Sequence, residues 1–177
     1  NYANAEVQLA KNYHRQGRLA EARVLLEKAA LLGEQINGKE GADYHWAFGL
    51  PLAQQNLLEN RPDDALRLLD AARPALLATY GPDHERTITL ENYFGRARQQ
   101  QGNAAEALAH FQVAFAALRR TFSDNFTFLS AAERENFVRG FARRQTEFLA
   151  FTRAFPEDAR VQGFAYDLTL FYKELLA

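Results

Sequence analysis

The sequence predicts an all-α fold in which antiparallel helix pairs stack side by side and one further helical hairpin follows. Two observations carry this prediction. One residue pattern recurs three times without gaps, and its turn residues Gly17, Asn60 and Gly102 lie 43 and 42 residues apart. A stripe of phenylalanines then continues at three- and four-residue spacing through the last third of the chain. A period of this length is typical of a solenoid built from helical pairs.

Composition narrows the classes of function. The chain has 177 residues, of which 47% are hydrophobic, with a formal net charge of −1. Near-neutral charge argues against a nucleic-acid or anionic-membrane partner, and no apolar run approaches the ~20 residues of a membrane span. The absence of cysteine excludes disulfides and thiolate chemistry and suits a cytoplasmic location. Because the chain begins at Asn1 and contains no methionine, we expect it to be a piece of a longer protein.

Each of the three repeats is expected to form a helix, a tight turn and a second helix. The turn residues are of the types that tolerate a left-handed helix end. Small side chains stand where the second helix crosses the first, at Ala22, Ala65 and Ala107. Larger apolar side chains follow on the same face, four residues later, at Leu26, Leu69 and Phe111.

These signals predict the bounds of six helices. The ranges are 3–16 and 19–36, 44–59 and 62–79, and 86–101 and 104–121. Pro62 is tolerated at the start of its helix, where no amide donor is needed. Pro51 falls inside the third helix and is expected to start or kink it near Leu50, which makes repeat two the least regular.

The repeat pattern resembles the tetratricopeptide repeat (TPR), and its kinesin-light-chain subtype in particular. The period of 42 residues is similar to that of the subtype, as is the linker of residues 81–87, Gly-Pro-Asp-His-Glu-Arg-Thr. The subtype commonly has Gly-x-x-His-Pro-x-Thr, so Glu85 replaces a proline, and the first linker lacks the motif. The resemblance implies a right-handed α-solenoid over residues 1–122, with repeats at about 3–37, 44–80 and 86–121.

Residues 123–177 are expected to form a C-terminal helical hairpin, with helices at 130–155 and 157–176. Ser130 and Glu133 predict a capping box, and Pro156 ends the first helix. Apolar stripes follow both helices, at Phe137, Phe141, Phe148, Phe151 and Phe155, and at Val161, Phe164, Leu168, Phe171 and Leu175. We expect these stripes to form a core.

The C-terminal hairpin also resembles the helical segment that precedes the caspase-like domain of bacterial TPR–CHAT proteins. Two stretches carry the resemblance, Phe-Leu-Ser-Ala-Ala-Glu-Arg at 128–134 and Ala-Tyr-Asp-Leu-Thr-Leu-Phe-Tyr-Lys at 165–173. It implies a CHAT domain after Ala177, outside this chain.

No catalytic, metal or cofactor site is expected. The four histidines fall at different repeat positions, which does not suit a zinc site. Ser123 and Ser130 do not stand in a nucleophile-elbow pattern, and no glycine-rich phosphate loop is present. A helical enzyme would need a constellation of residues that the sequence does not contain.

The first helix of each pair is expected to line the concave face of the stack, where a partner binds. The candidate groove residues are Asn4, Lys11, His14, Arg15, Gln54, Leu57, Asn92, Arg96, Gln99 and Gln100. Amide side chains can bond a peptide backbone, and the cationic side chains can pair with carboxylates. The resemblance to the kinesin-light-chain subtype also implies a groove role for Asn92. The alternative for each residue is a solvated helix face.

We therefore expect a protein- or peptide-binding scaffold, as the regulatory or sensor region of a larger, CHAT-containing protein. The alternative is a structural or self-association module, in which exposed helices at the two ends of the solenoid pair between copies.

Overall fold

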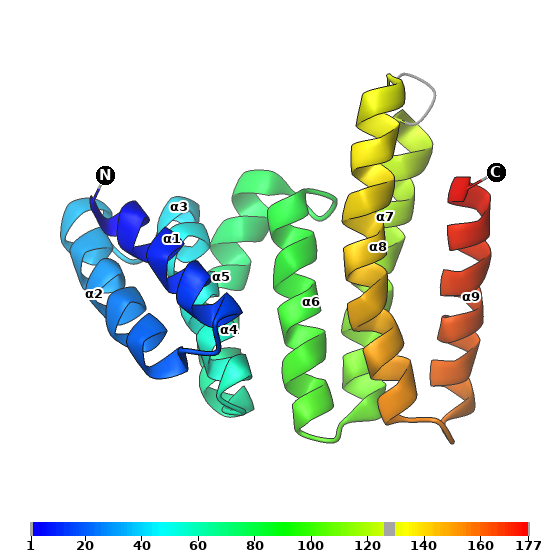
Figure 1. Cartoon of the computed structure of the whole chain (residues 1–177), viewed down its shortest axis with the longest axis horizontal. Helices are drawn as coiled ribbons and strands as arrows, with labels where there is room; N and C mark the ends of the chain where they lie inside the picture. The colour runs from blue at the N-terminus through cyan, green and yellow to red at the C-terminus, as the bar shows by residue number, and fades with distance from the viewer. Residues whose placement is uncertain (1, 126–129, 177) are drawn as a thin grey trace.

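The computed structural model describes residues 2–125 and 130–176, and every regular element in these ranges is helical. Two pairs form the first part, α1 (Tyr2–Arg15) with α2 (Leu19–Asn37), and the segment α3 (Ala42–Tyr44), η1 (His45–Gly49) and α4 (Leu50–Leu58) with α5 (Pro62–Tyr80). Two pairs follow, α6 (Glu85–Gln100) with α7 (Ala104–Asn125), and α8 (Ala131–Ala154) with α9 (Ala159–Leu176). Figure 1 shows the pairs in chain order from one end of the molecule to the other. The predicted all-α solenoid is confirmed.

The turns inside the three repeats share one geometry. Gly17, Asn60 and Gly102 all have positive φ, at 72°, 55° and 76°. In each turn the next N–H donates to a carbonyl five residues back, in the pairs Arg18 to Tyr13, Arg61 to Asn56 and Asn103 to Arg98, at 2.8–2.9 Å. This is the Schellman arrangement, which satisfies carbonyls at a helix end. The repeat register that predicted these turns is therefore correct.

The predicted helix crossings are also alike. Ala22, Ala65 and Ala107 are all completely buried, and so are Leu69 and Phe111, while Leu26 is 1% exposed. In repeat three the two helices pack so closely that a Cβ added at Gly95 would lie 2.7 Å from the Phe111 ring. Small residues at the crossings thus let paired helices approach closely.

Repeat two contains one additional residue in its first helix. In repeats one and three, two buried positions of the first helix are seven residues apart. They are Ala3 and Ala10 in repeat one, and Ile88 and Gly95 in repeat three. In repeat two the equivalent residues, His45 and Ala53, are eight apart. The π-helical turn η1 takes up the difference, and the Leu50 N–H donates to the His45 carbonyl. α4 then begins at Leu50, next to Pro51, where the sequence placed the irregularity.

The C-terminal hairpin shares a core with repeat three. Phe148 and Phe151 of α8 contact Phe111 of α7, with ring centroids 5.6 and 4.8 Å apart. Phe164 and Phe171 of α9 pack edge-to-face on Phe115, at 5.7 and 5.5 Å. Helix α7 continues through residues 122 and 123, where the sequence placed the end of the repeats.

The capping box at the start of α8 is present, since Glu133 and Ser130 each accept a hydrogen bond from the other's backbone N–H. Residues 126–129 lie outside the described part of the chain, and so do the side chains of Phe137, Phe141 and Leu175.

Candidate partner-binding groove

A groove runs across the first helices of the repeats. Two adjoining cavities of about 610 and 320 Å³ form it, and they share residues from α1, η1, α4 and α6. Glu147 of α8 lines one end. The shared residues are Gln8, Lys11, Trp46, Gln54, Thr89 and Tyr93. We call this surface the α1–α4–α6 groove.

The structure brings most of the candidate residues together in this groove. The residues that line it are Asn4, Lys11, His14, Arg15, Gln54, Asn92 and Arg96. Leu57 does not line it, because its side chain is 2% exposed and lies in the core with α5. Gln100 does not line it either: its amide donates to the Leu57 carbonyl at 2.8 Å and joins α6 to α4. Gln99 is half-buried outside the groove.

The sequence missed two aromatic residues of the groove, Trp46 and Tyr93. The π-helical turn explains Trp46, because the additional residue places it at the position that Asn4 and Thr89 hold in the other repeats. Its signal in the sequence was the eight-residue spacing from His45 to Ala53. A register carried over from the neighbouring repeats could not find this residue.

Three cationic side chains line the groove without a carboxylate partner in the described part of the chain, those of Lys11, Arg15 and Arg96. Arg15 donates to the Asn12 side chain at 3.4 Å, and the Arg96 guanidinium lies 5.8 Å from the centre of the Tyr93 ring. These positive charges are therefore free to pair with carboxylates of a partner.

Asn92 is the most unusual residue of the groove. Its side chain is 3% exposed, and the equivalent positions in repeats one and two hold the buried apolar residues Val7 and Leu50. The Asn92 Oδ1 atom is buried and has no hydrogen-bond partner in the described part of the chain. A buried acceptor left unpaired costs about 1–3 kcal/mol. A donor that entered the groove would remove this cost once the Asn92 amide rotates toward it, because Oδ1 is closed to solvent in this conformation.

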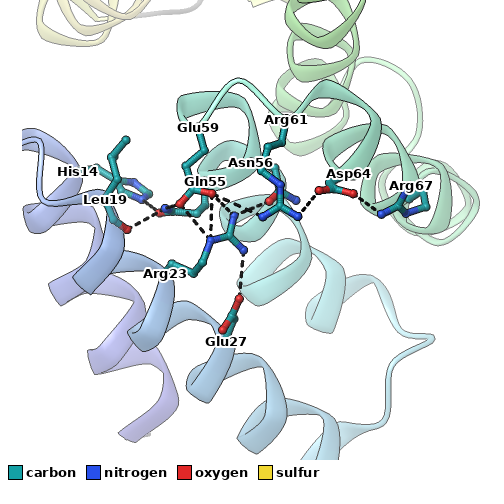
Figure 2. A network of polar contacts seen from close by, with 10 residues as sticks. All are labelled: His14, Leu19, Arg23, Glu27, Gln55, Asn56, Glu59, Arg61, Asp64 and Arg67. Atoms are coloured by element: carbon teal, nitrogen blue, oxygen red, sulfur yellow. Dashed lines mark hydrogen bonds and ion pairs between the residues drawn. The ribbon is translucent and has the colours of Figure 1, made fainter.

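A polar network joins repeats one and two at the turn end of the groove (Figure 2). The His14 ring bonds the Gln55 side chain, whose amide donates to the Leu19 carbonyl at 2.8 Å. Arg23 donates to Asn56 at 2.7 Å and pairs with Glu59. The hydrogen bond from Arg23 is the main cause that lowers the pKa of Glu59. The network fixes His14 at the groove edge and ties the two repeats together.

The described residues contain neither a metal-binding cluster nor a membrane-spanning helix. None of them form a group of three or more His, Cys, Asp or Glu side chains that could hold a metal ion. None of the helices in residues 2–125 and 130–176 has the length and hydropathy needed to cross a membrane.

Comparison with known proteins gives two matches to family models. Both families are described as tetratricopeptide repeat, and they match residues 43–120 and residues 7–43. A search of curated proteins finds no match. The two family matches end at residue 120, so the resemblance of the C-terminal hairpin to TPR–CHAT proteins stays a prediction.

Proposed function

The chain belongs to the tetratricopeptide repeat family, and from this premise we propose that its α1–α4–α6 groove binds an extended peptide segment of a protein partner. Such repeats generally mediate protein–protein interaction, and domains built from them are typically non-catalytic. The observation that carries the proposal is the buried, unpaired Oδ1 atom of Asn92. A peptide main-chain N–H is a donor of the kind that this atom lacks.

The charges and aromatic rings of the groove support a peptide with acidic side chains. Lys11, Arg15 and Arg96 offer positive charge to its carboxylates. They outnumber the two carboxylates that also line the groove, Glu85 and Glu147. Trp46 and Tyr93 supply apolar surface with polar edges, which is common where proteins recognise peptides.

The wider role is part of the same proposal. The groove would serve as the regulatory or sensor region of a larger cytoplasmic protein with a CHAT domain. The Leu-Ser-Ala-Ala-Glu stretch at residues 129–133 supports this link, and the lack of cysteine supports the location.

The test uses short peptides selected from a random display library by binding to the whole chain. Trp46 is the single tryptophan of the chain and lines the groove, so its fluorescence reports binding directly. We expect the selected peptides to be enriched in Asp and Glu. Asn92→Leu should weaken their binding about tenfold, because the acceptor is lost without a cavity. Arg96→Ala should weaken it about threefold to tenfold.

The matched control is Arg139→Ala, which removes an exposed arginine of α8 that does not line the groove. This variant should bind the selected peptides as the wild type does. Equal affinity of the wild type, Asn92→Leu and Arg96→Ala for these peptides would show that the groove is not their binding site.

A second candidate function is self-association through the ends of the solenoid. Leu9 is 42% exposed, whereas the equivalent Leu52 and Phe94 pack against the preceding repeat. At the other end Tyr166 and Leu170 are exposed on α9. Light scattering over a range of concentrations tests this. A dimer that Leu9→Glu abolishes would support self-association, and a monomer at all concentrations would exclude it.

A further inference from the structure

A second cavity lies outside the groove, between the second helices of repeats one and two. Its volume is about 1030 Å³, and α2 and α5 form its walls with η1 and α4 between them. It shares no lining residue with the α1–α4–α6 groove. We call it the α2–α5 cavity.

The next junction along the solenoid shows what normally occupies this space. Between α5 and α7, the buried carboxylate of Glu91 accepts from Arg73 at 3.0 Å and contacts His110 at 2.7 Å. The His110 ring stacks on Phe94, with centroids 4.9 Å apart. These side chains fill the junction between repeats two and three.

The equivalent positions at the first junction hold smaller or apolar side chains. By the repeat register, Ala30 replaces Arg73, Gly49 replaces Glu91 and Leu68 replaces His110. All three replacements line the α2–α5 cavity. The cavity is therefore the space that the Arg–Glu–His cluster occupies one repeat later.

One buried polar side chain lines the cavity. His45 lines it, is 8% exposed, and makes no side-chain hydrogen bond within the described part of the chain. Burial lowers the pKa of His45, so the ring is neutral and can bond a ligand through either nitrogen. A largely apolar cavity with one convergent polar group is typical of a small-ligand site.

The cavity rim is acidic. Glu27, Glu34 and Glu40 line it. Lys39, the one cationic side chain among the lining residues, pairs with Glu34 at 2.8 Å, and Arg23 pairs with Glu27 at 3.1 Å. Arg23 is shared with Glu59, and Glu40 has no ion pair in the described part of the chain. The rim therefore carries more negative than positive charge and complements a cation.

The length of the cavity decides between a small ligand and a helix of a protein partner. The lining residues extend only from Glu27 to Glu34 on α2 and from Leu68 to Ala75 on α5. Seven residue steps of α-helix cover about 11 Å. An isolated helix of fewer than roughly 12–15 residues is only marginally stable in water, and a helix of that length is about twice as long as the cavity. Both the length and the volume fit a compact organic molecule.

We propose that the α2–α5 cavity binds a small organic cation. Its apolar, ring-containing body lies among Leu52, Leu68 and Ala75, and its positive charge faces the glutamates of the rim. A polar atom of the body bonds the His45 ring. This site is separate from the peptide groove, and its test does not depend on whether the groove binds a peptide.

The experiment titrates the full chain with berberine, an aromatic cation whose fluorescence rises in apolar surroundings. We expect saturable binding of one berberine per chain. The anionic dye 1-anilinonaphthalene-8-sulfonate should bind at least about tenfold more weakly, because the rim repels it. Asn92→Leu should bind berberine as the wild type does, because Asn92 lies in the other site.

Two variants locate the berberine site. Leu68→Lys places a cation in the cavity and should weaken binding about tenfold or more. Leu77→Lys is the matched control, because Leu77 lies on the same helix outside the cavity and is already exposed. Glu27→Gln combined with Glu40→Gln alters two exposed side chains and removes one ion pair, that of Glu27 with Arg23, which keeps its pair with Glu59, so the fold should be preserved. It should weaken binding about threefold to tenfold.

Three results would overturn the proposal. The first is unchanged affinity of the Glu27→Gln, Glu40→Gln double variant for berberine. The second is equal binding of the anionic dye. The third is displacement of berberine by an amphipathic leucine–lysine helical peptide at concentrations below the Kd of berberine, which would assign the cavity to a helix of a protein partner.

Discussion

The junction between repeats one and two and the junction between repeats two and three join repeats that have the same internal helix crossings, but the two junctions differ in what fills them. Ala22, Ala65 and Ala107 are equally buried at the crossings. Outside the crossings, one junction is an apolar cavity and the other holds the buried carboxylate of Glu91 with its two partners. The difference teaches that the crossings maintain the solenoid. The side chains that face a neighbouring repeat differ from one junction to the next.

The largest expected effect tests whether the crossings carry the stability. Phe111→Ala removes a completely buried ring that contacts both Phe148 and Phe151, so it should lower the free energy of unfolding by about 3–5 kcal/mol. Leu69→Ala, at the equivalent position of repeat two, should cost about 2–5 kcal/mol. Urea denaturation measures both. A cost near zero at either position would mean that the two crossings are not equivalent.

The stability of the junction between repeats two and three should depend on the Glu91 carboxylate. Glu91→Gln removes the charge that faces Arg73 and His110, and we expect a loss of about 1–3 kcal/mol. Arg139→Ala breaks only an exposed pair with Glu135 and should change stability by less than about 0.5 kcal/mol. If thermal denaturation gives the same small change for both variants, the Arg–Glu–His cluster does not stabilise its junction.

The network at the turn end of the first junction should make stability depend on pH. The pKa of Glu59 is lowered mainly by the Arg23 hydrogen bond. The ionised Glu59 therefore contributes stability to the fold, and this contribution is complete above the unfolded pKa of about 4.3. It is lost as the pH falls through the folded pKa. Glu59→Gln should cost about 1–2 kcal/mol at neutral pH, and its difference from the wild type should shrink in acid. A difference that stays constant from pH 7 to pH 3 would contradict this assignment.

The smallest expected effect is a gain in stability at the junction between repeats one and two, where the α2–α5 cavity lies. Gly49 has φ of −63°, and the three atoms nearest to an added Cβ all belong to the His45 side chain, the first at 3.4 Å. Gly49→Ala should therefore stabilise the chain by about 0.4–1 kcal/mol, because it reduces the freedom of the unfolded chain. Gly95→Ala is the matched change in repeat three and should destabilise, since its Cβ would lie 2.7 Å from Phe111. Differential scanning calorimetry should show a higher Tm for Gly49→Ala and a lower Tm for Gly95→Ala. If both variants shift the Tm in the same direction, the two glycine positions do not differ in the way described.

Sequence reasoning predicted the features that depend on local conformation and repetition. The turns at Gly17, Asn60 and Gly102 and the capping box at Ser130 follow from residue type and spacing alone. It could not predict features that depend on a change of register. Trp46 entered the groove only because of the π-helical turn.

The same limit applies to side chains whose environment is set by other helices. Leu57 shares its register position with His14 but packs in the core. The α2–α5 cavity likewise depends on Ala30, Gly49 and Leu68, which three different segments of the chain bring together. Their counterparts at the next junction are the larger side chains of the Arg–Glu–His cluster.

The widened turn at residues 45–49 has a consequence for how such a protein can change over time. An amino acid inserted into an α-helix rotates everything beyond it by about 100°, which would point the rest of a repeat the wrong way. Here the insertion is absorbed on the spot, and the residues from Leu50 onward keep the orientation of their counterparts in the flanking repeats. A chain built in this way can gain a residue in one helix, acquire a new side chain on its binding surface, and leave the stacking of every later unit undisturbed.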